Sequence, residues 1–449
     1  MRAHIVLDLG FGDAGKGLLT DFLARESGSK LVVRYNGGAQ AAHNVVTSSG
    51  LHHTFAQFGS ASLIPGVRTF LSRYVVVHPT ALLVEAHVLK QKGAADVLER
   101  LRISELALLI TPYHQAANRI RELLRGNQRH GSCGVGVGET VADVVLYGEV
   151  PIIAGDMRNK VVLKQKLAAI RDYKYAEMKT LIGDQPLNDQ TAEELHIFED
   201  DGLLDHWISS IECFHSSKLV VPDALLADWM AEEKTVIFEG AQGVLLDAEY
   251  GFHPYTTWSN TTAENALEIL HEMAPQAEIN KVGVLRSHIV RHGPGPFPTE
   301  TNVFASHIHE HNTLDDWQGN VRYGWFDTVL ARYALKLVGG VDTLAVTHMD
   351  LLPKLNKWQI CSAYRNWDGM DETLLNLDIQ DGAVRNFMPR YQLSLDQRSV
   401  ITNILLQVRP VMQLIPSEEA PVLAQIGKQL DHPVNLISRG ATAEDMRKL

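Results

Sequence analysis

A glycine-rich loop, GFGDAGKG, follows the first apolar run of the chain. Gly15 and Lys16 complete the spacing G-x-x-x-x-G-K, in which backbone N–H groups and a lysine contact phosphate oxygens. Gly17 stands where such loops usually carry a hydroxyl that binds Mg²⁺. The Asp13 carboxylate can take over that task, because Mg²⁺ prefers oxygen ligands. The loop therefore predicts a phosphate site with an acid inside it; the alternative is a strand–turn–helix with spare glycines.

A second polar patch, GGAQAAH, comes directly after the next apolar run. It contains Gly38, Gln40 and His43. A lone histidine is more often structural than catalytic. This one follows a glycine turn at a predicted strand end, one unit after the phosphate loop, so a catalytic role is equally open.

Three later patches also end apolar runs. FEGAQGVLLDAEYGFHPYTTWSNTT holds Gln242, Asp247 and Thr257, whose polar groups could read a heterocycle and its phosphate or form a plain loop network. RHGPGPFPTE is rich in Pro and Gly, so we expect a stiff connection with little chemistry. THMD ends in Asp350, which could accept two hydrogen bonds from a guanine edge, although an Asp that caps a strand end is commoner.

Strands and helices must position these patches. A strand–loop–helix–strand order opens the chain and predicts an α/β fold with a large, mostly parallel central sheet and a P-loop-like nucleotide site. Ligands of such sheets bind at the carboxyl ends of the strands, so we expect the patches to form one site. The predicted strands lie at residues 3–9, 30–35, 73–79, 106–112, 235–243, 281–290 and 343–350.

The length of 449 residues suggests one large domain with appendages, or two to three domains. We predict a single domain over residues 1–449, because no convincing linker or internal repeat interrupts the chain. The amphipathic run LKQKLAAIRDYKYAEMKTLI marks a helical insertion at about residues 155–230. Short apolar and polar pieces at residues 355–449 predict a smaller, irregular C-terminal appendage.

The composition is that of an ordinary globular protein, with a net charge of −12 and a pI near 5.9. Such a charge disfavours a nucleic-acid protein held by bulk electrostatics. Cys133, Cys213 and Cys361 are far apart and predict neither a metal site nor a disulfide framework. With neither a signal-peptide pattern nor an apolar stretch of about 20 residues, we expect a cytoplasmic protein without a membrane partner.

Together the patches resemble the adenylosuccinate synthetase family. Its phosphate loop reads G-x-x-W-G-D-E-G-K-G, and here Phe11 and Ala14 replace Trp and Glu. Its G-G-x-N-A-G-H reads GGAQAAH, with Gln40 for Asn and Ala42 for Gly. FEGAQGVLLD, HPYTTWSNTT, GPGPFPTE and GWFD also match family elements, in the same order over nearly the whole chain.

The resemblance implies a reaction. GTP, with Mg²⁺, phosphorylates the 6-oxygen of IMP, and the amino nitrogen of aspartate then displaces the phosphate. The products are adenylosuccinate, GDP and phosphate; ATP stays open as an alternative donor. The resemblance also implies a homodimer whose partners are a purine nucleotide and an amino acid.

The resemblance further implies residue roles. Asp13 would remove the N1 proton of the purine and bind Mg²⁺ together with the backbone carbonyl of Ala42. His43 would donate a hydrogen bond or proton to the transferring oxygen, and Lys16 would hold phosphate. The implied GTP contacts are Gly12, Gly15, Lys16, Gly17, His348, Asp350, Ser438 and Gly440. The implied contacts of the other substrates are Gly38, Gln40, Ser132, Gln242, Thr257 and Arg322.

The loop expected to bind the amino acid departs from the family. The family reads T-T-G-R-x-R-R shortly before G-W-[FL]-D, whereas this chain reads LDDWQGNVRYGWFD. Only Arg322 remains, and Asp315 and Asp316 add negative charge where a dicarboxylate should dock. Arginines bind carboxylates bidentately, so their loss should cost several kcal/mol of affinity. Arg286 or Arg291 could fill in.

Two further motifs differ. The guanine motif T-K-x-D reads THMD, which keeps Asp350 and puts His348 in place of the Lys that covers the base. The segment R-G-I-G-P reads CGVGV. An ungapped alignment puts Val145 at the position of the Arg that a neighbouring subunit lends to the nucleotide phosphate.

Three functions follow from the resemblance and the departures. The first is the family ligation, with aspartate as the default amine. The second is a paralogue with another amine donor or purine; phage members that act on deoxyguanylate lose the loop acid, whereas this chain keeps Asp13. The third is a non-catalytic nucleotide-binding protein, which the joint presence of Asp13, Lys16 and His43 disfavours.

Overall fold

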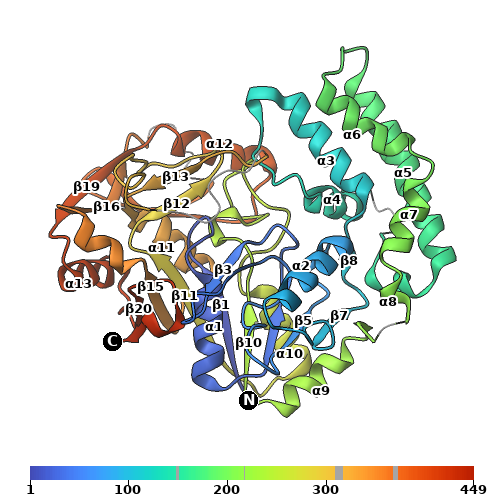
Figure 1. Cartoon of the computed structure of the whole chain (residues 1–449). Helices are drawn as coiled ribbons and strands as arrows, with labels where there is room; N and C mark the ends of the chain where they lie inside the picture. Colours follow the sequence, from blue (N-terminus) through green and yellow to red (C-terminus); the bar gives the residue numbers. More distant parts are fainter. Residues whose placement is uncertain (148–150, 217, 309–316, 368–372) are drawn as a thin grey trace.

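A ten-stranded sheet forms the centre of the molecule, with a helical lobe on one side and a second sheet on the other (Figure 1). The structure is a computed structural model that describes residues 1–147, 151–216, 218–308, 317–367 and 373–449. All neighbouring strands of the central sheet are parallel except the last pair, β20 and β21. The predicted α/β class with a large, mostly parallel sheet is therefore confirmed.

The strand order places β1 inside the sheet, between two strands that come much later in the chain. The sheet therefore extends from β1 in both directions. In doubly wound folds, ligands bind at the carboxyl ends of the strands near such a central point. In spatial order the strands are β21 (Met446–Lys448), β20 (Leu436–Ser438), β15 (Thr343–Thr347), β11 (Glu278–Arg286), β1 (Arg2–Asp8), β10 (Thr235–Glu239), β2 (Leu31–Arg34), β5 (Arg68–Leu71), β7 (Leu101–Ser104) and β9 (Val220–Val221).

The side chains of β1 show why the sheet needs cover on both faces. Successive side chains of a strand point to opposite faces. Ala3, Ile5 and Leu7 pack in one buried cluster that includes the three helices named next among other elements, whereas Val6 packs in another with α1. The helices are α9 (Ala224–Glu232), α10 (Glu264–Met273), α11 (Thr328–Leu337) and, on the other face, α1 (Lys16–Ser27).

A helical lobe lies at the right of Figure 1, and the predicted insertion at about residues 155–230 overlaps it. Helix α3 packs against α4, α5 and α6, so the lobe already begins at Pro112. Periodicity alone does not reveal this, because the partners of α3 lie later in the chain. The helices on this side are α2 (Pro79–Gln91), α3 (Pro112–Arg125), α4 (Val137–Tyr147), α5 (Lys160–Ile182), α6 (Asp189–Glu199), α7 (Leu203–Ser210) and α8 (Cys213–Ser216).

The C-terminal part adds a second sheet and two helices at the left of Figure 1. Trp358 and Phe387 of this sheet belong to the same buried cluster as one face of β1. The division of the chain into one domain with two appendages stays a prediction. The elements are β14 (Phe326–Asp327), β16 (Trp358–Arg365), β17 (Leu375–Gln380), β18 (Ala383–Pro389), β19 (Arg409–Ile415), α12 (Leu395–Leu405) and α13 (Glu419–Leu430).

Two of the predicted sheet strands are wrong. The apolar runs at 73–79 and 106–112 contain only β6 (Val76–Val77) and β8 (Leu108–Leu109), which pair with each other outside the central sheet. The central sheet instead uses β5 and β7, which directly precede them. Both runs are apolar because they are buried under the helical lobe, and an apolar run alone does not distinguish a strand from a buried connection.

A buried ion pair ties the glycine loop to β1. Asp8, the last residue of β1, accepts hydrogen bonds from the backbone N–H groups of Gly10 and Ala14, each at 2.9 Å. The Lys16 ammonium lies 2.8 Å from the same carboxylate, and the two side chains are 2% and 0% exposed. The loop is thus folded around an internal anion, and α1 begins at the lysine that neutralises it.

The close approach of β3 (His43–Val46) to α1 explains the glycine at position 17. A Cβ atom on Gly17 would lie 2.7 Å from the carbonyl oxygen of Asn44 and 3.1 Å from the carbonyl carbon of His43. The missing hydroxyl of the loop is therefore a packing requirement. It lets β3 bring His43 against the start of α1.

The ion pair leads to a stability prediction with a matched control. Asp8→Asn leaves Lys16 buried without its counter-ion, which should lower the free energy of unfolding by about 3–5 kcal/mol. Glu278→Gln breaks a pair with Arg2 of the same 2.8 Å length at the other end of β1, where the side chains are 67% and 52% exposed. That change should cost at most about 1 kcal/mol. Urea denaturation of both variants measures the difference, and equal losses would contradict it.

The packing of Gly17 leads to a second prediction. Gly17→Ser should destabilise the protein by about 1–3 kcal/mol, because the new Cβ meets backbone atoms that cannot rotate away. Gly427→Ser in α13 is the control, since the nearest atom to its new Cβ is the His432 carbonyl oxygen at 3.4 Å. Thermal unfolding compares the two variants. An unchanged melting temperature for the first would show that β3 yields easily.

Candidate functional site

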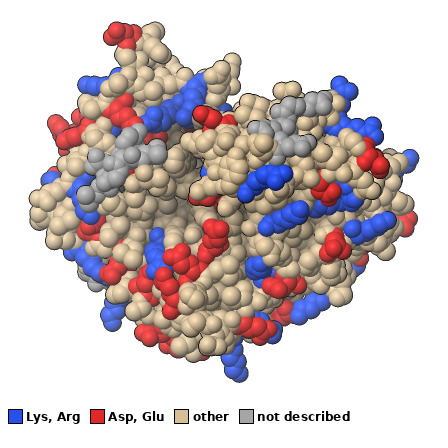
Figure 2. All heavy atoms as spheres, turned by 180° about the vertical axis from the view of Figure 1, so that it is seen from behind, with Lys and Arg blue, Asp and Glu red and all other residues tan. Residues whose placement is uncertain are grey.

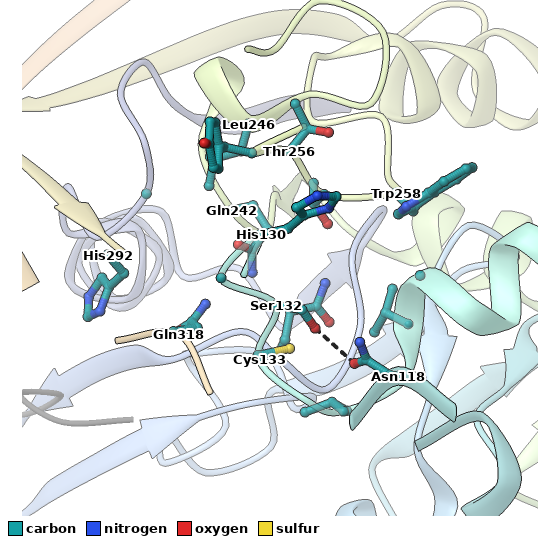
Figure 3. A pocket seen from close by; sticks show the side chains of 18 of the residues that line it. Asn118, His130, Ser132, Cys133, Gln242, Leu246, Thr256, Trp258, His292 and Gln318 are labelled. Carbon is teal, nitrogen blue, oxygen red and sulfur yellow. Dashed lines mark hydrogen bonds between the residues drawn. The ribbon is translucent and has the colours of Figure 1, made fainter. Parts of the chain in front are cut away.

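A cavity of about 740 Å³ lies at the carboxyl ends of β1 and β10, and its opposite wall is formed by α3, α4 and the loop between them. Five of the predicted substrate or catalytic positions that line it are Asp13, Lys16, His43, Gln242 and Thr257. The strands bring these residues together as the sequence predicted. Figure 3 labels the lining residues Asn118, His130, Ser132, Cys133, Gln242, Leu246, Thr256, Trp258, His292 and Gln318.

Asp13 lies in the wall of this cavity with an unusual backbone. Its φ of 57° is in the left-handed region, and its carbonyl oxygen accepts a hydrogen bond from Arg286 Nε. Its carboxylate oxygen Oδ2 lies 2.7 Å from His292 Nε2. Burial alone would raise the pKa of Asp13, but His292, Arg286 and Lys16 together hold this pKa well below its ordinary value. The carboxylate is therefore ionised at neutral pH.

His43 forms a second acid–histidine pair on the same cavity. Its Nδ1 lies 2.6 Å from Glu239 Oε1, and the glutamate also accepts hydrogen bonds from the backbone N–H and hydroxyl of Ser60. Burial lowers the pKa of His43 despite Glu239, so the ring is neutral at neutral pH. Burial would raise the pKa of Glu239, but Arg34 and His43 lower it.

The ionised Glu239 can only accept, so Nδ1 of His43 carries the proton. The other ring nitrogen, Nε2, has no hydrogen-bond partner in the described part of the chain although it is buried. A buried polar atom without a partner costs free energy, which a ligand in the cavity would relieve.

Polar side chains also line another part of the cavity. Both amide atoms of Gln40 are buried and have no hydrogen-bond partner among the described residues. Ser132 is held by Asn118, whose Oδ1 accepts its hydroxyl at 2.8 Å and the Gly136 N–H at 3.2 Å. A Cβ on Gly38 would meet the Gln40 amide oxygen at 2.9 Å, so Gly38 leaves room for this side chain. Gly12 and Ala42 also line the cavity.

Four of the residues implied for GTP lie at the carboxyl ends of two adjacent strands, β15 and β20, and do not line this cavity: His348, Asp350, Ser438 and Gly440. His348 has a left-handed φ of 59°, and its Nδ1 lies 2.9 Å from the Thr347 hydroxyl. Burial and Arg286 hold the pKa of His348 well below its ordinary value. Asp350 is exposed, and the Ser438 hydroxyl donates to the Gly440 carbonyl. Thr347 links this edge to the loop by donating to the Ala14 carbonyl at 2.8 Å.

Arg322 is not among the residues that line the cavity, and its role as a substrate contact stays a prediction. Its guanidinium donates to Glu300 and to the carbonyls of Gly293 and Gly295. Of the two alternatives, Arg291 lines the cavity. It is buried and donates to the carbonyls of Pro294 and Pro296, so both arginines brace the turn after β12. Asp315 and Asp316, which were expected to add negative charge where the amino acid docks, lie outside the described residues.

The segment RHGPGPFPTE was expected to be a stiff connection with little chemistry, but the structure places part of it at the cavity. It supplies Arg291, His292 and Pro294 to the cavity, and His292 contacts Asp13. The only sequence signal was its position after an apolar run, because its Pro and Gly content dominated the interpretation. Glu239 was also missed, because it lies in the middle of the predicted strand 235–243, whereas the observed strand β10 ends at this residue.

No helix in the described ranges combines the length and the apolar composition that a membrane span requires. Within those same ranges, no group of three or more His, Cys, Asp or Glu side chains is arranged to hold a metal by itself. On the face shown in Figure 2, basic and acidic side chains are interspersed.

Two solved structures share the fold over the whole length of this chain. One is fully ligated adenylosuccinate synthetase from Plasmodium falciparum, with a TM-score of 0.76, 20% identity and coverage of 100% of both chains. The other is succinoaminodeoxyadenylate synthetase of cyanophage S-2L bound to dGMP and dATP. It has a TM-score of 0.55 and 16% identity, and the match covers 100% of this chain and 95% of that chain.

Two sequence relatives are more similar to this chain than the two solved structures are. Adenylosuccinate synthetase from Clostridium beijerinckii is 33% identical over 374 residues, which cover 81% of this chain and 82% of that protein. The same enzyme from Microcystis aeruginosa is 30% identical over 457 residues, which cover 99% and 94%. The family model for adenylosuccinate synthetase matches residues 5–447. The chain therefore belongs to the adenylosuccinate synthetase family of C–N ligases, whose function is the GTP-dependent joining of IMP and aspartate.

Proposed function

We propose that this chain joins aspartate to IMP at the expense of GTP, with Mg²⁺ as the metal and Asp13, His43 and Lys16 as the central residues. The observation that carries the proposal is their convergence on one cavity with the Asp13 carboxylate ionised. A protein that only binds nucleotides needs no ionised base beside its phosphate loop. This favours a ligase over the binding-only alternative.

Phosphoryl transfer comes first. Asp13 takes the N1 proton of IMP, and the 6-oxygen attacks the γ-phosphorus while its bond to the β-phosphate oxygen breaks. GDP leaves with that electron pair. The aspartate nitrogen then attacks C6, phosphate leaves with the C6–O electron pair, and the nitrogen loses a proton to solvent.

His43 and Lys16 would stabilise the charge of the transferred group. A negative phosphoryl group close to Nε2 would raise the pKa of His43 again, which turns the ring into a donor to the transferring oxygen. The Lys16 ammonium has three N–H donors. One is directed to Asp8, which leaves two for phosphate.

The described residues fit Mg²⁺. Mg²⁺ in nucleotide enzymes takes one or two protein oxygens and completes its octahedron with phosphates and water, so a closed protein cluster is not required. The Asp13 carboxylate and the Ala42 carbonyl line the same cavity and would hold the ion there. Bound Mg²⁺ would neutralise charge on the β- and γ-phosphates.

The remaining expectations belong to the same proposal. We propose that Gly12, Gly15, Gly17, His348, Asp350, Ser438 and Gly440 form the GTP site and that Gly38, Gln40, Ser132, Gln242 and Thr257 contact the other nucleotide. Adjacent strand ends support the first set and the cavity wall supports most of the second. The cytoplasm and a homodimer complete the proposal; Val145, at the position of the lent arginine, is 65% exposed.

A different amine donor is the second candidate function. The observation in its favour is that Arg322 and Arg291 direct hydrogen bonds to Glu300 and to backbone carbonyls around the turn after β12. A dicarboxylate would have to compete with these bonds for a guanidinium.

Phosphate release separates the candidates. The purified chain is incubated with IMP, Mg²⁺ and either GTP or ATP, and a panel of amines is added one at a time. We expect release with aspartate, because the family chemistry and the site support it. Release with another amine only would establish the second candidate, and release with ATP alone would correct the donor. No release with any combination would refute the ligase proposal.

Asp13→Asn tests the base. Asparagine keeps the size of the side chain but cannot accept the N1 proton, so kcat should fall by about 10²–10⁴-fold. Nucleotide affinity should stay within about tenfold, because Lys16 and the loop backbone remain. Steady-state kinetics and equilibrium binding of GTP measure the two effects. Unchanged turnover would show that another group takes the proton.

A further inference from the structure

We infer that His292 is a positioning residue: its hydrogen bond to Asp13 Oδ2 fixes the Asp13 carboxylate for metal binding and proton removal. The inference rests on the proposed function for the role of Asp13. It concerns a segment that the sequence marked as a mere connection, and it assigns a task to a side chain that contacts the proposed base and acts through it.

The geometry of the contact carries the argument. His292 Nε2 and Asp13 Oδ2 are 2.7 Å apart, and both side chains line the cavity with exposures of 19% and 28%. An ionised carboxylate can only accept hydrogen bonds, so Nε2 must donate. Charge-assisted bonds of this length are the stronger class of hydrogen bond. Figure 3 shows His292 at the edge of the cavity, far from Trp258 at the other side of the view.

The position of His292 is set without help from Asp13. His292 ends β12 (Ile289–His292), which pairs with β13 (Val321–Gly324), and its register partner is Val321. The turn that follows is held by Arg291, which donates to the Pro294 carbonyl, and by Arg322, which donates to the carbonyls of Gly293 and Gly295. The ring therefore extends from a braced two-stranded ribbon.

Asp13 needs such a support. Arg286 holds only its main-chain carbonyl, and the backbone is in a conformation that non-glycine residues rarely adopt. In the described part of the chain, the carboxylate has one hydrogen-bond partner, His292, and Oδ1 has none. Without the ring, the short side chain could rotate about χ1 and χ2. With Oδ2 fixed, Oδ1 keeps a defined direction for a ligand.

Loss of the hydrogen bond between His292 and Asp13 should lower turnover and metal affinity rather than nucleotide affinity. Misplacing a catalytic group by about 1 Å can cost about 10²-fold in rate. Removing a hydrogen-bond partner of a metal-ligating carboxylate typically costs about 10–100-fold in metal affinity. The phosphate loop itself is folded around Asp8 and does not depend on His292.

Three variants separate positioning from other roles. His292→Leu removes the donor and keeps the bulk. His292→Gln keeps an N–H donor of similar reach, whereas His292→Asn is too short to reach Oδ2 and serves as the second loss variant if the leucine variant does not fold. His271→Gln is the control, because His271 is exposed on α10, away from the cavity.

The first measurement is turnover by phosphate release, with the amine that supports it in the wild type. We expect kcat to fall about 10–100-fold for His292→Leu and His292→Asn, with KM for IMP and GTP within about threefold. His292→Gln should recover most of kcat, and His271→Gln should equal the wild type. A wild-type kcat in the leucine variant, or equal losses with glutamine and leucine, would overturn the inference.

The second measurement does not require turnover, so it stands even if the proposed function fails. Mn²⁺ serves as a spectroscopic probe, and its affinity is measured in the presence of GTP by electron paramagnetic resonance. We expect His292→Leu to weaken Mn²⁺ binding about tenfold or more and His292→Gln to restore it. Equal Mn²⁺ affinity in all variants would overturn the positioning role, whereas absence of ligation in the wild type alone would overturn only the proposed reaction.

Discussion

The buried ion pair between Asp8 and Lys16 is the constraint on which the site depends. Asp8 gathers the N–H groups of Gly10 and Ala14 and the Lys16 ammonium around one carboxylate. Three further groups are tied to this loop. Asp13 lies inside it, His43 packs on the helix that begins at its end, and Thr347 fastens it to β15.

Much of this arrangement could be predicted from the sequence. Parallel strands end at the same edge of a sheet, so polar residues after consecutive apolar runs had to converge. Asp13, Lys16, His43 and Gln242 were predicted in this way, and they line one cavity. The missing hydroxyl at Gly17 was recognised, but its reason was not, because the approach of β3 to α1 is a tertiary contact.

The failures have a common physical origin. The apolar runs at 73–79 and 106–112 were taken for sheet strands, yet their burial comes from the helical lobe. The segment that carries His292 was interpreted from its composition, and Arg322 was assigned from a motif. In the structure one supports Asp13 and the other pairs with Glu300. Partner choice among side chains is decided by packing between distant segments, which single-sequence patterns do not encode.

Two acid–histidine pairs border the cavity in opposite orientations. In one, the acid Asp13 is 28% exposed and the histidine supports it from the wall. In the other, Glu239 is fully buried and supports His43, whose Nε2 lacks a partner in the described residues. The same two residue types thus present an ionised acceptor at one place and a neutral ring at another. Phosphoryl transfer to a 6-oxopurine needs both, since a proton must leave N1 while charge develops on the transferring oxygen.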